Sequence, residues 1–198
     1  MTHAMNKLTR ADLLPLERYA AERSEFRTRV IAHKKCRRIA LGPNVSLLFE
    51  DRLTVQYQIQ EMLRIERIFE AAGIQDELDA YNPLIPDGSN LKATMLIEIP
   101  DPELRAERLS QLGGIEHRLY AAVPGLARIF ANADEDMDRS DDHKTSAVHF
   151  VRFEFPAEAI AALRAGGSLA FGIEDPRLPA FVQVPEAARS ALLSDFQH

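Results

Sequence analysis

Two segments in the first third of the chain carry side chains whose types and spacing could support acid–base chemistry or anion binding. Residues 33–38 read His-Lys-Lys-Cys-Arg-Arg, and such dense basic runs bind phosphate and other anionic groups. The second segment, residues 53–71, has helical apolar periodicity. Viewed down the helix axis, Glu66 falls between Val55 and Ile59 on the apolar face. A carboxylate on a core-facing surface needs a partner or a raised pKa, because burying it unpaired is costly.

The two segments predict a polar pocket between two helices that pack antiparallel. His33 falls on the apolar face of the first helix, where it could meet Glu66 and form an acid–base pair that acts on a small anionic substrate. The candidate catalytic residues are Glu66, His33 and Glu61, and the candidate ligand-binding residues are Arg37, Lys34, Arg38 and Arg27. The simpler alternative is a buried ion pair that fixes the register of the two helices.

Metal and nucleotide chemistry find little support in the sequence. The single cysteine, Cys36, excludes an internal disulfide and a cysteine-based zinc site. Residues 134–138 imitate the start of a calcium loop, but Arg139 stands where that loop needs glycine and Thr145 where it needs glutamate. The Walker A, Gly-x-Gly-x-x-Gly, Gly-x-Ser-x-Gly and His-Glu-x-x-His patterns are absent. No metal ligand is predicted, the cofactor is left unknown, and a metal-binding module stays an alternative.

Composition and charge bound the class of protein. Of the 198 residues, 46% are hydrophobic and 27% charged, as in an ordinary globular protein. The net charge is −6, yet residues 1–40 carry ten Lys/Arg against four Asp/Glu, while residues 41–198 sum to −12. The basic part either docks on the acidic part of the same chain or binds an anionic ligand or partner. The overall acidity, without aromatic residues among the cations, argues against nucleic acid.

Neither a membrane span nor a signal peptide is expected. No apolar run approaches the ~20 residues that cross a bilayer, and Asp12 and Glu17 interrupt the N-terminal stretch. Cytoplasm is therefore the expected compartment. A homodimer is compatible with the sequence.

A helix, a hairpin and a second helix would position the candidate residues. Pro15 predicts the start of a helix that runs to about Lys35, and two β-rich runs follow it, separated by Gly42-Pro43-Asn44. The second long helix is expected over residues 53–71, ending at Gly73.

A turn-rich stretch at residues 82–90 predicts a boundary between two domains. The first would be a helix–hairpin–helix element over residues 1–85, and the second an α+β domain over residues 86–198. The two could also form one compact unit.

The clearest pattern is a strand–helix–strand unit that occurs twice after this boundary. In each copy a proline opens the helix and two glycines follow its end, which is the asymmetry that helix termini favour. The first copy spans strands at 91–99 and 117–123 around a helix from Pro102, and the second spans strands at 146–155 and 168–173 around a helix from Pro156. Two such units in series predict a ferredoxin-like β-α-β-β-α-β arrangement, with a C-terminal helix from Pro185.

Several segments resemble one bacterial family, the domain of unknown function DUF3501. The resemblance is carried by Ala32-His33-Lys34-Lys35, Leu41-Gly42-Pro43-Asn44-Val45, Leu48-Phe49-Glu50-Asp51, the run from Gln58 to Glu66, Pro86-Asp87-Gly88 and Lys92-Ala93-Thr94-Met95. It covers nearly the whole chain and indicates kinship rather than chemistry. It implies a role in peroxide or redox metabolism, because such proteins are encoded beside rubrerythrin-like proteins and iron–sulfur oxidoreductases.

The leading hypothesis is an accessory or ligand-binding protein of a redox or peroxide-stress system, with rubrerythrin-like and iron–sulfur redox proteins as partners. An enzyme that acts on a small anionic substrate and a metal-binding module are the alternatives. The most informative observation is where Glu66 and His33 lie relative to each other and to the nearest pocket.

Overall fold

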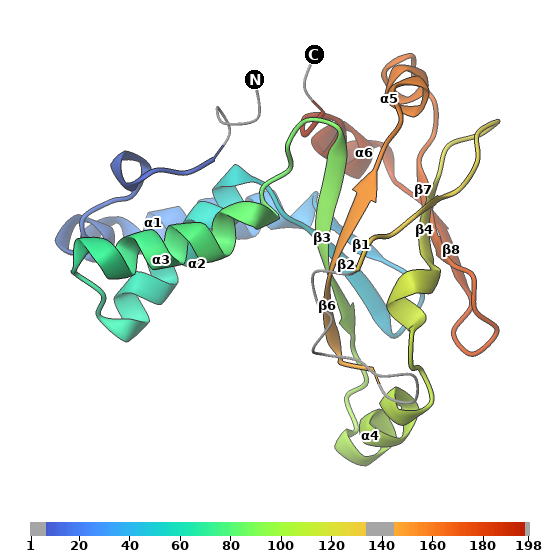
Figure 1. Cartoon of the computed structure of the whole chain (residues 1–198), viewed down its shortest axis with the longest axis horizontal. Helices are drawn as coiled ribbons and strands as arrows, with labels where there is room; N and C mark the ends of the chain where they lie inside the picture. Colours follow the sequence, from blue (N-terminus) through green and yellow to red (C-terminus); the bar gives the residue numbers. More distant parts are fainter. Residues whose placement is uncertain (1–6, 134–144, 197–198) are drawn as a thin grey trace.

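Three helices form an arm that extends from one side of a β-rich body (Figure 1). The computed structural model describes residues 7–133 and 145–196. The arm contains α1 (Leu16–Lys35), α2 (Arg52–Glu66) and α3 (Ala71–Tyr81), with short 3-10 helices at Arg10–Asp12 and Asn82–Leu84. The segment that imitates a calcium loop, residues 134–138, lies outside the described residues.

The strands of the body form two antiparallel sheets, in the orders β1-β2-β3-β6 and β5-β4-β7-β8. The strands are β1 (Arg38–Ala40), β2 (Val45–Phe49), β3 (Asn90–Ile97), β4 (Leu119–Ala122), β5 (Ile129–Phe130), β6 (Val148–Glu154), β7 (Ala170–Ile173) and β8 (Ala180–Gln183). The helices of the body are α4 (Pro102–Ser110), α5 (Ala157–Arg164) and α6 (Glu186–Leu193), with a 3-10 turn at Ile115–Arg118. Two main-chain hydrogen bonds between Asn132 and Arg152, at 2.7 and 2.9 Å, join the two sheets.

The main apolar core lies between the sheets. Phe49 of β2, Phe153 of β6 and Phe171 of β7 meet there, with ring centroids 5.0 to 6.4 Å apart. Strand β6 alternates buried and half-buried residues, whereas all of β7 is buried. Leu163 of α5 and Leu192 of α6 close the core. This α+β architecture agrees with the expected fold class.

The repeated unit is present, but its two copies are arranged differently from the prediction. Strands β3 and β4 lie in different sheets, and so do β6 and β7. Equivalent strands of the two copies pair antiparallel instead, β3 with β6 and β4 with β7. The ferredoxin-like arrangement is therefore not confirmed, because it would place all of these strands in one sheet. Accordingly, α4 and α5 lie at opposite ends of the body (Figure 1).

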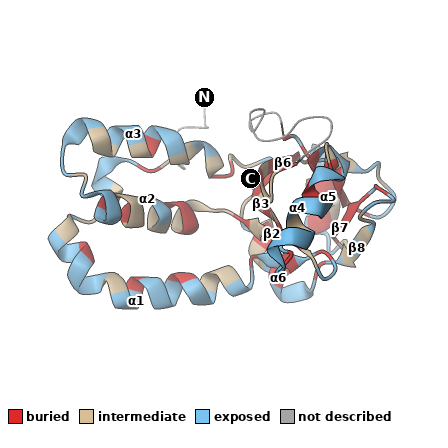
Figure 2. Cartoon of the chain, turned by 90° about the horizontal axis from the view of Figure 1, so that it is seen from below, coloured by how far each residue is buried: buried red, intermediate tan, exposed pale blue. Residues whose placement is uncertain are grey.

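Helix α2 packs between α1 and α3 (Figure 2), and its buried residues Ile59 and Leu63 belong to one apolar cluster with Leu78 of α3. Its N-terminus is capped by Asp51, whose carboxylate accepts a hydrogen bond from the Thr54 N–H at 2.9 Å. The helix ends at Glu66, because Arg67 adopts the left-handed conformation with a φ of 57° and its N–H returns to the Leu63 carbonyl. This end comes earlier than the residue 71 expected from the sequence.

The hairpin β1–β2 belongs to the body rather than to the arm. Strand β2 pairs with β3 along its whole length, from Val45 opposite Ile97 to Phe49 opposite Ala93. The chain thus leaves the arm at the end of α1, forms the edge of a sheet, and returns to the arm at Asp51. Residues just before and just after the hairpin therefore lie where arm and body meet.

Candidate functional site

The structure brings His33 and Arg37 together, but their partners are aspartates rather than Glu66. His33 Nε2 lies 2.5 Å from the Oδ2 atom of Asp51, and Arg37 Nε lies 3.4 Å from the same oxygen. Burial disfavours ionisation of Asp51, but the charge of Arg37 and hydrogen bonds from Thr54 and His33 outweigh it. They hold the pKa of that carboxyl below its ordinary value.

Arg37 is buried, with only 1% of its surface exposed. Its guanidinium donates to the carbonyls of Phe49, Glu50 and Ala191 at 3.1 to 3.2 Å, and it forms an ion pair with Asp195. Burial raises the pKa of Asp195 to about 6, since the single charge of Arg37 is shared with Asp51 and offsets the burial only in part. These contacts leave Arg37 no free face for a ligand.

Glu61 takes part in a separate ion pair within the arm. Its carboxylate accepts two hydrogen bonds from Arg23, at 2.8 and 2.7 Å, and one from the Tyr19 hydroxyl at 2.7 Å. The hydrogen bonds from Arg23 make the largest contribution to lowering the pKa of Glu61 to about 2. Burial, and then the hydrogen bond to Glu61, raise the pKa of Tyr19 above its ordinary range.

The remaining predicted residues lie apart from both clusters. Glu66 is exposed at the last position of α2, Arg38 pairs with Glu98 at 2.8 Å, and Arg27 is exposed on α1. The four residues of the predicted enzyme site, His33, Arg37, Glu61 and Glu66, therefore do not converge on one cavity.

One predicted ligand-binding residue, Lys34, does line a cavity at the junction of arm and body. The cavity encloses about 200 Å³ and is called the arm–sheet pocket below. It is lined by Lys34 of α1, Glu50, Val55 and Gln58 of α2, Tyr81 of α3, Leu84, Thr94 of β3 and Phe150 of β6. The sheet thus forms its floor and the helical arm its walls.

Two side chains of the arm–sheet pocket, Lys34 and Glu50, carry opposite charges, and within the described residues no ion pair joins them. The Lys34 ammonium lies 6.0 Å from the centre of the Tyr57 ring, and within the described residues no carboxylate forms an ion pair with it. The Glu50 carboxylate accepts hydrogen bonds from the Thr54 hydroxyl at 2.6 Å and the Thr94 hydroxyl at 3.1 Å. Both hydroxyls orient Glu50 without supplying a positive charge.

Sequence reasoning missed Glu50, Thr94 and Tyr81 as pocket residues. Glu50 stands between a strand and a helix cap, and Thr94 lies on a strand that approaches it only in the folded chain. A signal was nevertheless present, because Lys34, Glu50, Gln58 and Thr94 all fall in segments that carry the family resemblance.

Among the described residues, no group of three or more His, Cys, Asp and Glu side chains is arranged to hold a metal ion. Within the same residues, no helix is both long and apolar enough to cross a membrane.

Comparisons with known proteins assign the family. The model of the family described as "Protein of unknown function (DUF3501)" matches residues 7–196. A crystal structure of a novel protein of unknown function from Burkholderia pseudomallei K96243 is similar over 100% of both chains, with 47% sequence identity and a TM-score of 0.90. No curated protein matches the sequence. The chain thus belongs to the DUF3501 family.

Proposed function

We propose that this protein binds a small organic acid carrying a second polar group, such as an amino or hydroxy acid, in the arm–sheet pocket. One observation carries the proposal. Lys34 and Glu50 line the same cavity with opposite charges, and neither has an ion-pair partner within the part of the chain that the structure describes.

The two charges suit opposite ends of one small molecule. A ligand carboxylate would accept a charge-assisted hydrogen bond from the Lys34 ammonium. An amino or hydroxyl group of the ligand would donate to Glu50, whose orientation is already fixed by two hydroxyls. The side-chain amide of Gln58, without a hydrogen bond in the described residues, offers a donor and an acceptor at the rim.

The size and build of the cavity support a small ligand. Its volume of about 200 Å³ lies below the roughly 300–1,000 Å³ that pockets for drug-sized molecules enclose. The Glu50 N–H donates to the Lys92 carbonyl at 2.9 Å, which fixes its backbone to β3. Polar groups that are positioned before the ligand arrives lose little entropy on binding.

Titration calorimetry of the purified chain with alanine, serine, lactate and glycolate tests the proposal. Substitution Lys34→Gln should weaken binding by about 10- to 100-fold, because one charge-assisted hydrogen bond is lost. Substitution Lys35→Gln removes the same charge from the next, exposed position and should leave the affinity unchanged. The amides alaninamide and lactamide should bind weakly to the wild type.

Glu50→Gln tests the other end of the ligand. It should weaken alanine and serine more than lactate and glycolate, since an ammonium group gains more from a carboxylate than a hydroxyl does. If none of the four acids binds to the wild type, the proposal is wrong. Equal losses in the Lys34 and Lys35 variants would remove it too, because they would indicate a diffuse effect of charge.

We further propose that ligand binding serves an accessory role in a redox or peroxide-stress system, with rubrerythrin-like proteins and iron–sulfur oxidoreductases as partners. This context is what kinship with the DUF3501 family implies, through the redox proteins encoded beside its members. Affinity capture of such proteins with the tagged chain, under reducing and oxidising conditions, tests it. If neither condition retains them, the partner proposal is wrong, and the proposal of ligand binding is not affected.

A further inference from the structure

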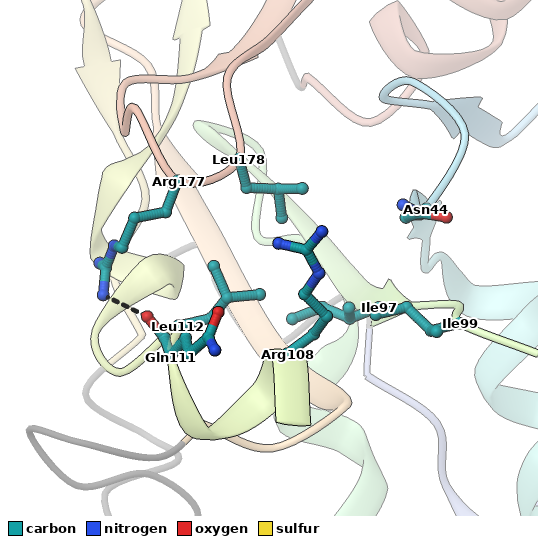
Figure 3. A pocket seen from close by; sticks show the side chains of 8 residues that line it. All are labelled: Asn44, Ile97, Ile99, Arg108, Gln111, Leu112, Arg177 and Leu178. Carbon is teal, nitrogen blue, oxygen red and sulfur yellow. Dashed lines mark hydrogen bonds between the residues drawn. The ribbon is translucent and has the colours of Figure 1, made fainter. Parts of the chain in front are cut away.

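A second cavity lies at the far end of the body, where α4 meets the β1–β2 turn and the loop between β7 and β8 (Figure 3). It encloses about 360 Å³ and shares no residue with the arm–sheet pocket. We infer that this α4 pocket binds an organic acid with an apolar body, such as a branched-chain or aromatic monocarboxylate.

The cation of the site is Arg108. Its side chain rises from α4 into the cavity, and the guanidinium points toward Leu178 (Figure 3). Within the described residues it forms neither an ion pair nor a side-chain hydrogen bond. Arginine stays charged at any physiological pH and presents a planar set of donors that matches a carboxylate. An unneutralised guanidinium at a cavity wall therefore favours an anionic group there.

Apolar side chains form the rest of the wall. Ile97, Ile99 and Leu112 are buried members of the main core, and Leu178 packs against that core from the loop. A ligand body that covers these side chains removes their remaining apolar surface from water, which favours binding by roughly 25 cal/mol for each Å² covered. The volume lies within the range of pockets for small organic molecules.

Another residue at the cavity, Arg177, fixes the loop that carries Leu178. This side chain points away from the cavity and binds both carboxylate oxygens of Asp175, at 2.9 and 2.7 Å. It also donates to the carbonyls of Gln111 and Gly113, at 2.8 and 3.1 Å. Arg177 thus ties the loop that carries Leu178 to the end of α4, and it is not itself available to an anion.

Two amides supply neutral hydrogen-bonding groups in the same cavity. Asn44 faces the cavity from the β1–β2 turn, and its backbone carbonyl accepts from the Glu98 N–H at 2.7 Å. Gln111 lines the cavity at the end of α4. Within the described residues, neither side-chain amide has a hydrogen bond. Each amide therefore offers a neutral donor to a ligand in the cavity.

Titrations of the full chain with benzoate and 4-methylpentanoate, followed by two-dimensional amide NMR, test the inference. The neutral counterparts benzamide and 4-methylpentanamide report on the apolar wall alone. Both acids should shift the amide signals of α4 and the β1–β2 turn and should bind about 10- to 100-fold more tightly than their amides, since a charge-assisted pair is added.

Arg108→Gln should abolish the preference for the acid while the weak binding of the amides persists, and Arg108→Lys should retain part of that preference. Arg27→Gln removes the same charge from an exposed position of α1, outside this cavity, and it should leave the preference intact. The inference fails if neither acid binds the wild type, if the Arg108 variants keep the preference, or if the signals that shift surround Lys34 instead.

Discussion

Arg37 and Asp195 form an ion pair between residues that stand 158 positions apart in the sequence, and it joins the first hairpin to the end of α6. Both side chains are almost completely buried. Arg37 also reaches Asp51, which is in contact with His33, so one line of polar contacts runs from α1 through the cap of α2 to the C-terminal helix. The residues that look most reactive in the sequence are thus engaged in holding arm and body together.

Substitution Arg37→Gln should reduce the free energy of unfolding by about 3–5 kcal/mol, because it leaves buried carboxylates without their cation. It also removes the donors of three backbone carbonyls. The neighbouring substitution Arg38→Gln removes a half-exposed ion pair with Glu98 and should cost less than about 1 kcal/mol. Urea unfolding followed by circular dichroism at pH 7 measures both values. Similar small losses in the two variants would contradict the structural role of Arg37.

The stability of the protein should depend on pH through Asp195 in an unusual direction. Its folded pKa of about 6 lies above the ordinary value of 3.8, so the folded state binds the proton more tightly than the unfolded state. The contribution of Asp195 is therefore most favourable below pH 4 and declines as the pH rises to 6, by an amount on the order of 3 kcal/mol. Relative to Asp195→Asn, the wild type should lose stability over this range in urea unfolding.

Asp175 provides a control of the opposite sign. Hydrogen bonds from Arg177 hold the pKa of Asp175 below its ordinary value, although burial opposes them. Relative to Asp175→Asn, the wild type should therefore lose stability as the pH falls through the acid range. If the Asp195 and Asp175 variants showed the same pH trend, the assignment of a raised pKa to Asp195 would be wrong.

Glu61 and Glu66 should differ sharply in their contribution to stability. Glu61 has a folded pKa of about 2 and is mostly buried with Arg23, so Glu61→Gln should cost about 1–3 kcal/mol at pH 7. That cost should shrink as the pH falls from 4.5 toward 2, since protonation breaks the pair in the wild type. Glu66→Gln changes an exposed side chain and should cost less than about 0.5 kcal/mol. Equal costs would indicate that Glu66 has a partner.

Glu66 lies apart from the other predicted residues at the end of a helix. Its spacing places Glu66 in line with Val55 and Ile59, but it is the last residue of α2 and is exposed, and Arg67 turns the chain into the left-handed region. A stop at an arginine carries no glycine or proline signal, and Gly73, which suggested the end, lies inside α3. There its missing side chain lets Ile68 approach, because a Cβ would stand 2.8 Å from that residue's Cγ2 atom.

Local sequence patterns predicted the helices and strands of the body, but they did not predict which strands pair with each other. Asp101 followed by Pro102 indicated the start of α4, and the Asp101 carboxylate does accept from the Leu104 N–H at 2.8 Å. Which strand lies beside β3 depends on contacts between residues far apart in the sequence, such as Leu91 of β3 opposite Phe153 of β6. For the same reason the arm–sheet pocket was not predicted, since Lys34 and Thr94 belong to different elements that meet only in the folded chain.

The pairing of equivalent strands can be tested in the pair formed by β4 and β7. Gly172 stands opposite Tyr120, and a Cβ added at Gly172 would lie 2.5 Å from the Tyr120 ring and 2.9 Å from the Ala180 carbonyl. The ring is confined by Phe130 and Arg128, with centroid distances of 5.9 and 4.4 Å, so it has little room to move. Gly172→Ala should therefore cost about 1–3 kcal/mol in urea unfolding.

A double-mutant cycle separates this clash from a general weakening of the strand. In a Tyr120→Leu background the ring is gone, so the cost of Gly172→Ala should fall by at least about 0.5 kcal/mol. The Ala180 carbonyl remains in place and sets the residual cost. If the two substitutions were additive, Tyr120 would not lie over Gly172, and the register that pairs the second strands of the two repeated units would be wrong.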